Sequence, residues 1–316
     1  VILTGEVQAS SGEAAYFIGA DYLFGNQYDV VPRHPNWLFE NMKRSLELYP
    51  SVDAYYVILP EKIIALAEGT GGQIDPAVSA SNLDAFLEYS SEKGIKAIDL
   101  CEPLLTGYSV QERAAMYFKT DFHWNAKGAY ACCSLLAQQL AQEGIIDASQ
   151  IPGGADFFWQ DLSDSKSYKG DLAMRLSEEL TVAESIPRCI PADTSGMAYY
   201  LDLSDAAVPR ETVIGSGIED EILDYNKLYC YNLPYYRVEN ENALCAKEVL
   251  IYKDSYENAC TDYLSVLFQT VHVIDPRFEE TYSFTEMMDG RNIDLVLFLF
   301  HEDNLSTELR NYLHQD

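Results

Sequence analysis

The sequence has few basic residues. Its 316 residues include 21 Lys and Arg against 50 Asp and Glu, which gives a formal net charge of -29. Because like charges repel, a polyanion such as nucleic acid would be repelled by this protein rather than gathered by it. We therefore expect no nucleic-acid partner.

Long apolar runs are missing as well. No window reaches the roughly 18 consecutive apolar residues that a membrane-spanning helix needs. The opening Val-Ile-Leu-Thr-Gly is too short for a signal peptide. Since the sequence begins with Val1 rather than Met, we expect that a signal or anchor segment preceded it. With 48% hydrophobic residues the chain can still bury a large core, as one large domain or two smaller ones.

Cysteine spacing gives little guidance. The seven cysteines form no CxxC pair. Cys132 and Cys133 lie inside a predicted helix, where a buried thiol packs as a small apolar group. An odd number leaves at least one thiol free, and whether two of Cys189, Cys230 and Cys245 form a bridge stays open.

Cofactor motifs are also lacking. Neither GxGxxG nor GxxxxGK[ST] occurs, and the Gly-Thr-Gly-Gly run at 69–72 is interpreted as a turn. There is no HExxH and no close His/Cys spacing typical of a metal site. We expect no cofactor and no metal.

Short apolar runs alternate with amphipathic segments along the chain. This alternation indicates an α/β fold with a doubly wound, mostly parallel sheet covered by helices on both faces. The predicted strands are 14–24, 54–59, 97–100, 248–252, 271–275 and 294–300. The predicted helices are 35–48, 82–93, 125–143 and 256–268.

Residues 147–246 break this alternation. The segment contains five prolines, several glycines and short mixed runs. We predict that residues 1–146 and 247–316 together form one α/β domain, and that 147–246 is an inserted irregular or β-rich region.

The most informative run is Tyr-Phe-Lys-Thr-Asp-Phe-His-Trp-Asn-Ala-Lys-Gly-Ala-Tyr, residues 117–130. Asp121 and His123 lie two positions apart just ahead of an amphipathic helix, and side chains at i and i+2 of an extended segment point to the same side. Asp121 can therefore orient His123, fix its tautomer and stabilise its charged form. A purely structural histidine beside aromatic residues is the alternative, and Trp124 is interpreted as a packing residue.

Ser255 is the candidate nucleophile. It falls where a predicted strand gives way to a helix, a position at which serine caps the helix or exposes its hydroxyl beside N–H groups that stabilise an oxyanion. Both roles can hold at once. Serine needs a base within hydrogen-bonding reach, and the carboxyl ends of strands in such a sheet bring distant segments together. These features predict a Ser255, His123 and Asp121 site for acyl-ester chemistry.

Other assignments stay open. Four further histidines compete as the base, namely His34, His272, His301 and His314. His301, which follows the last predicted strand and precedes two acidic residues, is the main rival. A metal site combining Asp121, His123 and His301, or paired carboxylates for glycoside hydrolysis, has no supporting motif.

The 117–130 run resembles the signature of the DHHW protein family of Gram-positive bacteria and, more distantly, the alginate O-acetylation proteins AlgJ and AlgX. Those proteins are SGNH-hydrolase-like. In them the Asp-x-His pair precedes the serine, as Asp121 and His123 precede Ser255 here. Weaker similarities extend over most of the chain, at 59–62, 169–172, 253–256 and 275–277. Phe122 departs from the pattern, because the family name implies histidine there.

The resemblance implies an SGNH-like, flavodoxin-like three-layer fold. It implies Ser255 as nucleophile, His123 as base and Asp121 as the residue that orients it. It also implies that Gly170 lines the oxyanion site and that Arg277 binds substrate, although a structural role suits either residue equally well. An extracytoplasmic location behind an N-terminal anchor is a further implication.

Two functions follow as hypotheses. The first is an O-acyl, most simply acetyl, transferase or esterase that acts on a cell-surface glycan through a serine ester; the sequence does not decide between transfer and hydrolysis. Its candidate partners are a cell-surface polysaccharide or other acylated glycan and a membrane acyl-transfer protein. The second is a non-catalytic surface or carbohydrate-binding protein whose site has decayed, for which the 23 tyrosines would suit sugar stacking.

Overall fold

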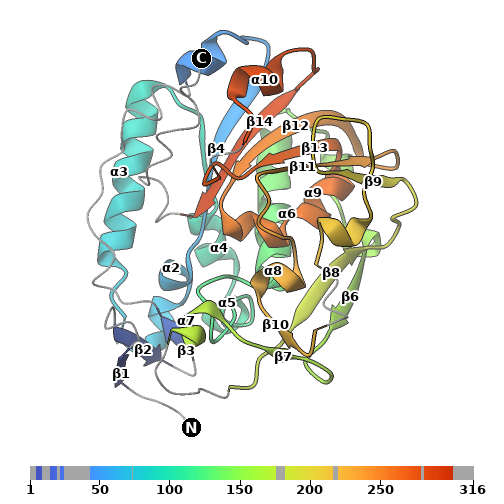
Figure 1. The fold of residues 1–316 in the computed structure, drawn as a ribbon. Coiled ribbons are helices and arrows are strands. Elements are labelled where there is room, and N and C mark those ends of the chain that lie inside the picture. The colour runs from blue at the N-terminus through green and yellow to red at the C-terminus, as the bar shows by residue number, and fades with distance from the viewer. Residues whose placement is uncertain are drawn as a thin grey trace.

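A seven-stranded sheet forms the centre of the molecule. The computed structural model describes residues 5–8, 15–19, 22–24, 43–72, 74–175, 182–215, 220–278 and 281–301. The strand order is β5-β4-β14-β12-β13-β11-β9 (Figure 1). The bounds are β4 (Asp53–Leu59), β5 (Ala97–Asp99), β9 (Met197–Tyr200), β11 (Tyr235–Asn240), β12 (Cys245–Lys253), β13 (Phe268–Ile274) and β14 (Leu295–His301).

Five neighbouring strands of this sheet run parallel, from β5 to β13, and β11 and β9 close one edge antiparallel. The parallel strands are near-continuous apolar runs, because a parallel sheet is buried on both faces. Every residue of β14 is buried. The predicted α/β class with a mostly parallel sheet is confirmed.

Alternate residues of one strand enter two separate hydrophobic clusters. Val57 belongs to the cluster that includes Leu136, whereas Ile58 belongs to the cluster that includes Phe86. Strand side chains alternate between faces, so helices cover the sheet on both sides and give three layers. The helices are α6 (Ala126–Gln142) and α9 (Thr261–Leu267) in the first cluster, and α3 (Ala77–Lys93) and α10 (Phe284–Met288) in the second.

Shorter elements complete the described chain. The helices are α2 (Lys62–Leu66), α4 (Cys101–Gly107), α5 (Val110–Ala114), α7 (Asp171–Met174) and α8 (Tyr225–Leu228), with 3-10 turns η1 (Ala67–Thr70), η2 (Ala148–Gln150), η3 (Gly154–Asp156), η4 (Arg210–Thr212) and η5 (Ser255–Ala259). The remaining strands are β1 (Gly5–Gln8), β2 (Ala15–Gly19), β3 (Tyr22–Phe24), β6 (Phe157–Asp161), β7 (Ser167–Tyr168), β8 (Pro187–Pro191) and β10 (Ile222–Leu223).

Two predicted elements differ from the structure. The predicted strand 14–24 is replaced, in its described residues, by β2 and β3 of a small antiparallel sheet with β1. The predicted helix 256–268 is divided into η5 and α9, and Phe268 already begins β13. Asn258 binds the side chains of Asn226 and Asn232 at 3.0 Å each, and apolar periodicity does not reveal such polar contacts. Of the predicted helix 35–48, residues 43–47 are helical and 35–42 lie outside the described residues.

The predicted insertion at 147–246 contributes to the central sheet. Its strands β9 and β11 extend the sheet beyond β13, while β6 pairs with β8 and β7 pairs with β10 in two separate ribbons. The division into an α/β domain and an inserted region stays a prediction.

All seven cysteines lie in the described ranges, and each carries a free thiol. None of the helices in the described part of the chain combines the length and apolarity needed to span a bilayer.

Candidate functional site

The candidate site lies at the carboxyl ends of three adjacent parallel strands. β12 ends at Lys253, two residues before Ser255; β14 ends at His301, and β4 leads through Pro60 into α2 (Figure 1). Polar groups from separate segments therefore meet at one edge of the sheet, where open α/β sheets place their ligands.

Ser255 begins the 3-10 turn that follows β12. The preceding residue, Asp254, caps this turn, and its Oδ1 accepts a hydrogen bond from the Tyr256 N–H at 2.9 Å. The abrupt change from strand to turn exposes the serine hydroxyl beyond the sheet, although only 8% of the residue is exposed to solvent.

The sequence predicted an extended segment around His123, but the residue lies in a tight loop. The loop is closed by a bridge between Tyr117 and Trp124 and by a bond from Phe118 N–H to the His123 carbonyl. Within it the Asp121 carboxylate accepts the backbone N–H of His123 at 3.1 Å. This local turn, rather than strand alternation, aligns the two side chains.

The structure brings the three predicted side chains together. His123 Nδ1 lies 2.7 Å from Asp121 Oδ1, and His123 Nε2 lies 2.8 Å from Ser255 Oγ. An ionised carboxylate only accepts hydrogen bonds, so the Nδ1 proton faces Asp121 and Nε2 is free to accept the serine proton. The arrangement can perform nucleophilic acyl transfer. The catalytic roles themselves stay a prediction.

Asp121 has further partners beyond His123. Its Oδ2 accepts hydrogen bonds from the Tyr168 hydroxyl at 2.8 Å and from the Asp171 N–H at 3.0 Å. Burial raises the pKa of Asp121. The charge and ring hydrogen bond of His123 and the backbone N–H groups of Asp171 and His123 outweigh this effect and hold the pKa well below its usual value. Asp121 is thus a carboxylate at neutral pH.

Lys62 supports the backbone of the same loop. Its Nζ donates to the carbonyl oxygens of Leu23, Lys119 and Asp121 at 2.6, 3.2 and 2.7 Å. Three acceptors match the three N–H donors of an ammonium group. Burial lowers the pKa of Lys62 to about 7, against the opposing effect of the charges on Glu184 and Asp121.

Glu184 holds the loop from its other side. Its carboxylate accepts the backbone N–H groups of Lys119 and Thr120 at 2.9 and 2.6 Å, and the Thr120 hydroxyl at 2.6 Å. The residues leading to Asp121 are thereby fixed by one buried cation and one carboxylate.

Gly170 packs directly against this loop. A Cβ atom at position 170 would lie 2.2 Å from the Thr120 carbonyl oxygen and 2.6 Å from the Asp121 nitrogen. The residue has φ -71, so its backbone conformation does not require glycine; the close approach does. Gly170 therefore touches the backbone of Asp121, and its predicted oxyanion role stays a prediction.

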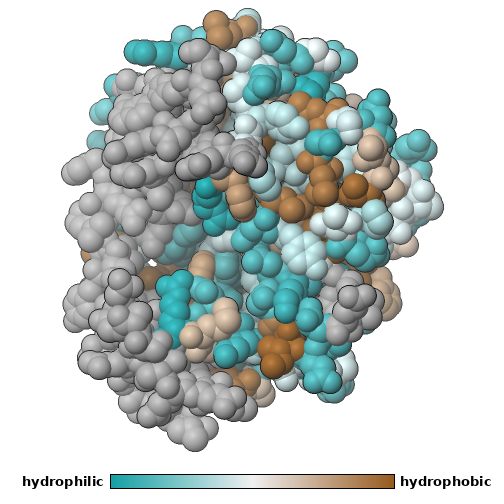
Figure 2. Space-filling view, in the orientation of Figure 1, coloured by the Kyte–Doolittle hydropathy of each residue, from teal (hydrophilic) through white to brown (hydrophobic). Residues whose placement is uncertain are grey.

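Aromatic rings enclose the imidazole. Tyr225 stacks on His123 with ring centroids 3.9 Å apart and planes 9° apart, and Phe122 packs on it at 3.9 Å. Trp124 is fully buried and donates from Nε1 to the Tyr256 carbonyl at 2.9 Å, in agreement with a packing role. Hydrophilic side chains, with a few hydrophobic ones between them, cover the nearby surface over α7, α8 and the β7–β10 pair (Figure 2).

His301, the main rival base, binds carboxylates. Its Nδ1 lies 2.6 Å from Asp254 Oδ2, and its Nε2 lies 3.2 Å from Glu61 Oε1. The imidazole that reaches the Ser255 hydroxyl is that of His123. Among the described residues, no group of three or more His, Cys, Asp or Glu side chains is arranged to hold a metal ion.

The other candidates lie elsewhere or have partners. His272 is buried between the Tyr235 hydroxyl and Glu248, each at 2.8 Å. His34 and His314 are outside the described residues. Arg277 follows β13 and binds the buried carboxylate of Asp275 through Nε at 2.8 Å and through Nη2, so its predicted contact with substrate remains a prediction.

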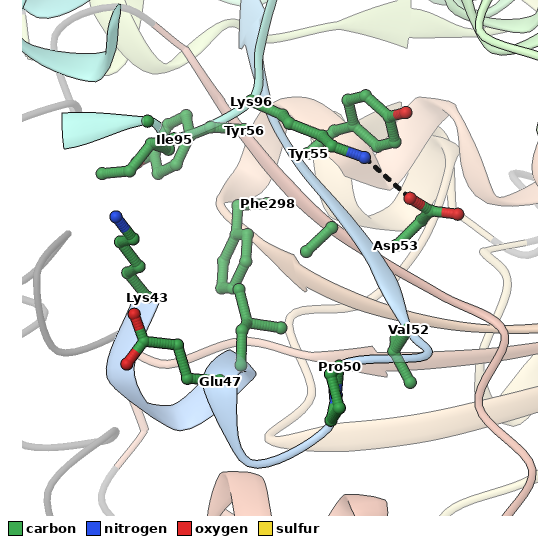
Figure 3. A pocket seen from close by; sticks show the side chains of 13 residues that line it. Lys43, Glu47, Pro50, Val52, Asp53, Tyr55, Tyr56, Ile95, Lys96 and Phe298 are labelled. Carbon is green, nitrogen blue, oxygen red and sulfur yellow. Dashed lines mark hydrogen bonds and ion pairs between the residues drawn. The ribbon is translucent and has the colours of Figure 1, made fainter. Parts of the chain in front are cut away.

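A hollow of about 390 Å³ lies at the opposite, amino end of β4 (Figure 3). Tyr55, Phe298 and Ile95 line it, and Lys96 and Asp53 pair at its rim at 2.7 Å. It is remote from the Ser255 edge of the sheet and contains neither a serine nor a histidine among its described lining residues.

Residues 33–189 match a family described as "SGNH hydrolase-like domain, acetyltransferase AlgX". The chain contains an SGNH hydrolase-like domain. The matched residues include Asp121 and His123 and end before Ser255. The predicted resemblance and the SGNH-like fold are confirmed. A comparison with curated proteins finds no match.

Solved structures resemble this SGNH-like chain over nearly its whole length. Bacillus cereus PatB1 is 22% identical, with a TM-score of 0.74 over 94% of this chain and 99% of PatB1. A DHHW family protein from Eubacterium siraeum is 18% identical, with a TM-score of 0.67 over 99% of both chains. The O-acetyltransferase domain of Pseudomonas putida AlgJ is 15% identical, with a TM-score of 0.54 over 96% of this chain and 93% of that domain. At these identities the likeness establishes the fold.

Sequence reasoning missed several residues of the SGNH-like site. Tyr168 and Tyr225 were hidden among 23 tyrosines, and Glu184 among 50 acidic residues. Lys62 gave a weak signal, because the 59–62 segment was among the similarities to the family. No local pattern marked any of these residues as a partner of the Asp121 loop.

Proposed function

We propose that this protein is a serine-dependent O-acetyltransferase that acts on a cell-surface polysaccharide, with Ser255 as nucleophile, His123 as base and Asp121 as the residue that orients the base. One observation carries the proposal: the continuous chain of hydrogen bonds from Ser255 Oγ to His123 Nε2 at 2.8 Å and from His123 Nδ1 to Asp121 at 2.7 Å.

The first half-reaction forms an acetyl-serine. Ser255 Oγ attacks the carbonyl carbon of the donor ester while its proton passes to His123 Nε2. The tetrahedral intermediate carries a negative oxygen, for which we propose the N–H groups of Ser255 and Gly170 as donors. The intermediate then expels the donor alcohol, which takes the proton from His123.

The second half-reaction runs through the same groups. His123 takes the proton of an acceptor hydroxyl, the acceptor oxygen attacks the acetyl-serine, and the ester bond to Ser255 breaks as Oγ regains a proton. Asp121, held as a carboxylate by its low pKa, stabilises the charged imidazole in both halves. A sugar hydroxyl as acceptor gives transfer, and water gives hydrolysis.

The family supports the choice of acetyl, and the resemblance to the alginate O-acetylation proteins suggests the glycan acceptor. The matched domain is named for the acetyltransferase AlgX, and the AlgJ structure is that of an O-acetyltransferase domain. We further propose an extracytoplasmic location, a membrane acyl-transfer protein as the source of the acetyl group, and Arg277 as a contact for the substrate.

The direct test is a burst assay with p-nitrophenyl acetate. The protein should release p-nitrophenol in a rapid first turnover and gain one acetyl group on Ser255, detected by mass spectrometry of the peptide. Ser255→Ala should abolish both signals. Ser265→Ala is the matched control, because Ser265 is buried and its hydroxyl donates within its own helix, to the Thr261 carbonyl.

A sulfonyl fluoride offers a second test, since PatB1 has been solved with a sulfonyl adduct. Labelling should occur at Ser255 and disappear in the alanine variant. If the native protein gives neither a burst nor labelling, the proposed enzymatic function is refuted. Binding of glycans without turnover would then favour the alternative function, a non-catalytic carbohydrate-binding protein.

A further inference from the structure

A second histidine lies on the other side of the nucleophile turn. His301 stacks on the Tyr256 ring with centroids 4.8 Å apart, and His123 lies 5.2 Å from the same ring. Tyr256 follows Ser255 directly and donates from its hydroxyl to the Phe122 carbonyl at 2.7 Å. The two imidazoles therefore flank one aromatic residue of the turn, but their hydrogen-bond partners differ.

Both ring nitrogens of His301 face carboxylate oxygens. The partners are Asp254 at Nδ1 and Glu61 at Nε2, at 2.6 and 3.2 Å, and all three residues are at least 90% buried. Ionised carboxylates accept hydrogen bonds only. With both carboxylates ionised, the imidazolium is the form of His301 that offers a proton to each of them. His123 differs, because its second nitrogen faces a hydroxyl.

Asp254 is the link between His301 and the nucleophile. Its Oδ1 accepts the Tyr256 N–H, and its Oδ2 accepts both the ring and the backbone N–H of His301, the latter at 2.8 Å. The carboxylate thus ties the last residue of β14 to the turn that contains Ser255. A fully buried negative charge next to the nucleophile is costly unless a cation offsets it.

We propose that His301 is a positioning residue: as an imidazolium between Asp254 and Glu61 it fixes the Ser255 turn and offsets the charge of Asp254. This inference rests on the proposed function. Without the imidazolium, the charge of Asp254 would oppose the oxyanion that forms at Ser255 and would favour the protonated state of His123, in which that residue cannot act as a base.

Other charged groups near Asp254 modify this balance without replacing His301. Arg277 interacts electrostatically with Asp254, but its guanidinium is bound to Asp275. Glu257, in the same turn, is a further carboxyl group near Asp254; burial raises its pKa to about 7, and its Oε2 lies 3.9 Å from Nζ of the buried Lys253. His301 bonds Asp254 directly, through both its ring and its backbone N–H.

The test uses two variants and a matched control on the full chain. His301→Gln removes the imidazolium, and Glu61→Gln removes one of the flanking negative charges. His272→Gln is the control, because His272 is also buried, lies in strand β13 of the same sheet and also bonds a carboxylate, Glu248. The readouts are thermal stability and the rate of the p-nitrophenol burst between pH 5 and 9, which is roughly the range over which a histidine base titrates.

We expect His301→Gln to slow the burst by about tenfold or more, which corresponds to about 1.4 kcal/mol of transition-state stabilisation. We also expect the acidic limb of its pH profile to move to higher pH, because Asp254 is then uncompensated. Glu61→Gln should move that limb to lower pH, because it removes a negative charge. His272→Gln should lose stability and keep the burst rate and profile of the native protein.

The results separate this inference from the proposed function. A native protein without a burst refutes the proposed function, and this inference with it. The positioning role alone is overturned if the native protein gives a burst that His301→Gln leaves unchanged. It is also overturned if the acidic limbs of the pH profiles do not move in opposite directions in His301→Gln and Glu61→Gln. If His301→Gln does not fold, the shift in Glu61→Gln decides the question.

Discussion

The two ends of the central sheet are built from different chemistry. At the carboxyl end, His123 lies among buried carboxylates, each with hydrogen-bond donors. At the amino end, the hollow is lined in part by Tyr55, Tyr56 and Phe298, and its rim pair, Lys96 and Asp53, is exposed by 54% and 42%.

The two ends differ in how much charge they bury. Burying a charge costs several kcal/mol unless it is paired and hydrogen-bonded, so a fold that concentrates buried charges at one edge must satisfy each of them. The exposed pair at the other edge involves little of that cost. Substitutions at the two ends should therefore have very different effects.

The largest contrast is expected for Asp121→Asn. An amide at 121 can no longer fix the His123 tautomer or stabilise its charged form, so the burst rate should fall by about 10³- to 10⁴-fold. Asp53→Asn, at the amino end, should leave the rate unchanged. Equal rates in the two variants would remove the functional distinction between the ends.

A loss of stability of about 3 kcal/mol or more is expected for Lys62→Met, because the buried carbonyl oxygens of Leu23 and Asp121 lose the lysine donor and the Lys119 carbonyl keeps only the Leu23 N–H. Urea unfolding gives the measurement. Lys127→Met, an exposed lysine on α6, is the control and should change stability by less than about 0.5 kcal/mol. A similar result for both variants would mean that the buried cation does not support the Asp121 loop.

Glu257 should make stability depend on pH. Burial raises its pKa from 4.5 to about 7, so between these values the folded state binds more protons than the unfolded state. Stability should therefore fall as pH rises through this window, by at most roughly 3 kcal/mol. Glu257→Gln should flatten the dependence of stability on pH relative to the native protein. Unfolding measured at about pH 4.5, 5.5 and 7.5 spans the window between the two pKa values. A slope that persists in full would assign it to other groups.

The smallest effect is expected at the rim of the amino-end hollow. Lys96→Gln breaks the exposed pair with Asp53 and should cost about 1 kcal/mol or less, decreasing further in high salt. The burst rate should not change. A larger loss of activity would show that this end of the sheet contributes to function.

The parallel sheet and the pairing of Asp121 with His123 could be predicted from patterns within short segments of the sequence. Strands predicted at 54–59 and 294–300 correspond to β4 and β14, since apolar runs report burial directly. The strand-to-turn position of Ser255 predicted its pairing with His123, 132 positions away, and the family resemblance implied the same pairing.

The rest depended on contacts that have no local signature. Lys62 reaches Asp121 across 59 positions, and Tyr168 reaches it across 47. The Asp121 loop was expected to be extended, but its own side chain caps a tight turn. The prediction of one continuous helix at 256–268 was wrong. Its first residues form a 3-10 turn in which the Asn258 side chain binds Asn226, a contact that the apolar pattern does not reveal.

The short strand β3 has a practical consequence for trimming the protein. The Leu23 carbonyl accepts from the Lys62 ammonium, and the Leu23 N–H donates to the Lys119 carbonyl at 2.7 Å. A truncated version that started at residue 33, where the family match begins, would delete both contacts. Boundaries for recombinant expression should therefore keep residues 22–24, because without them the Asp121 loop loses two of its supporting hydrogen bonds.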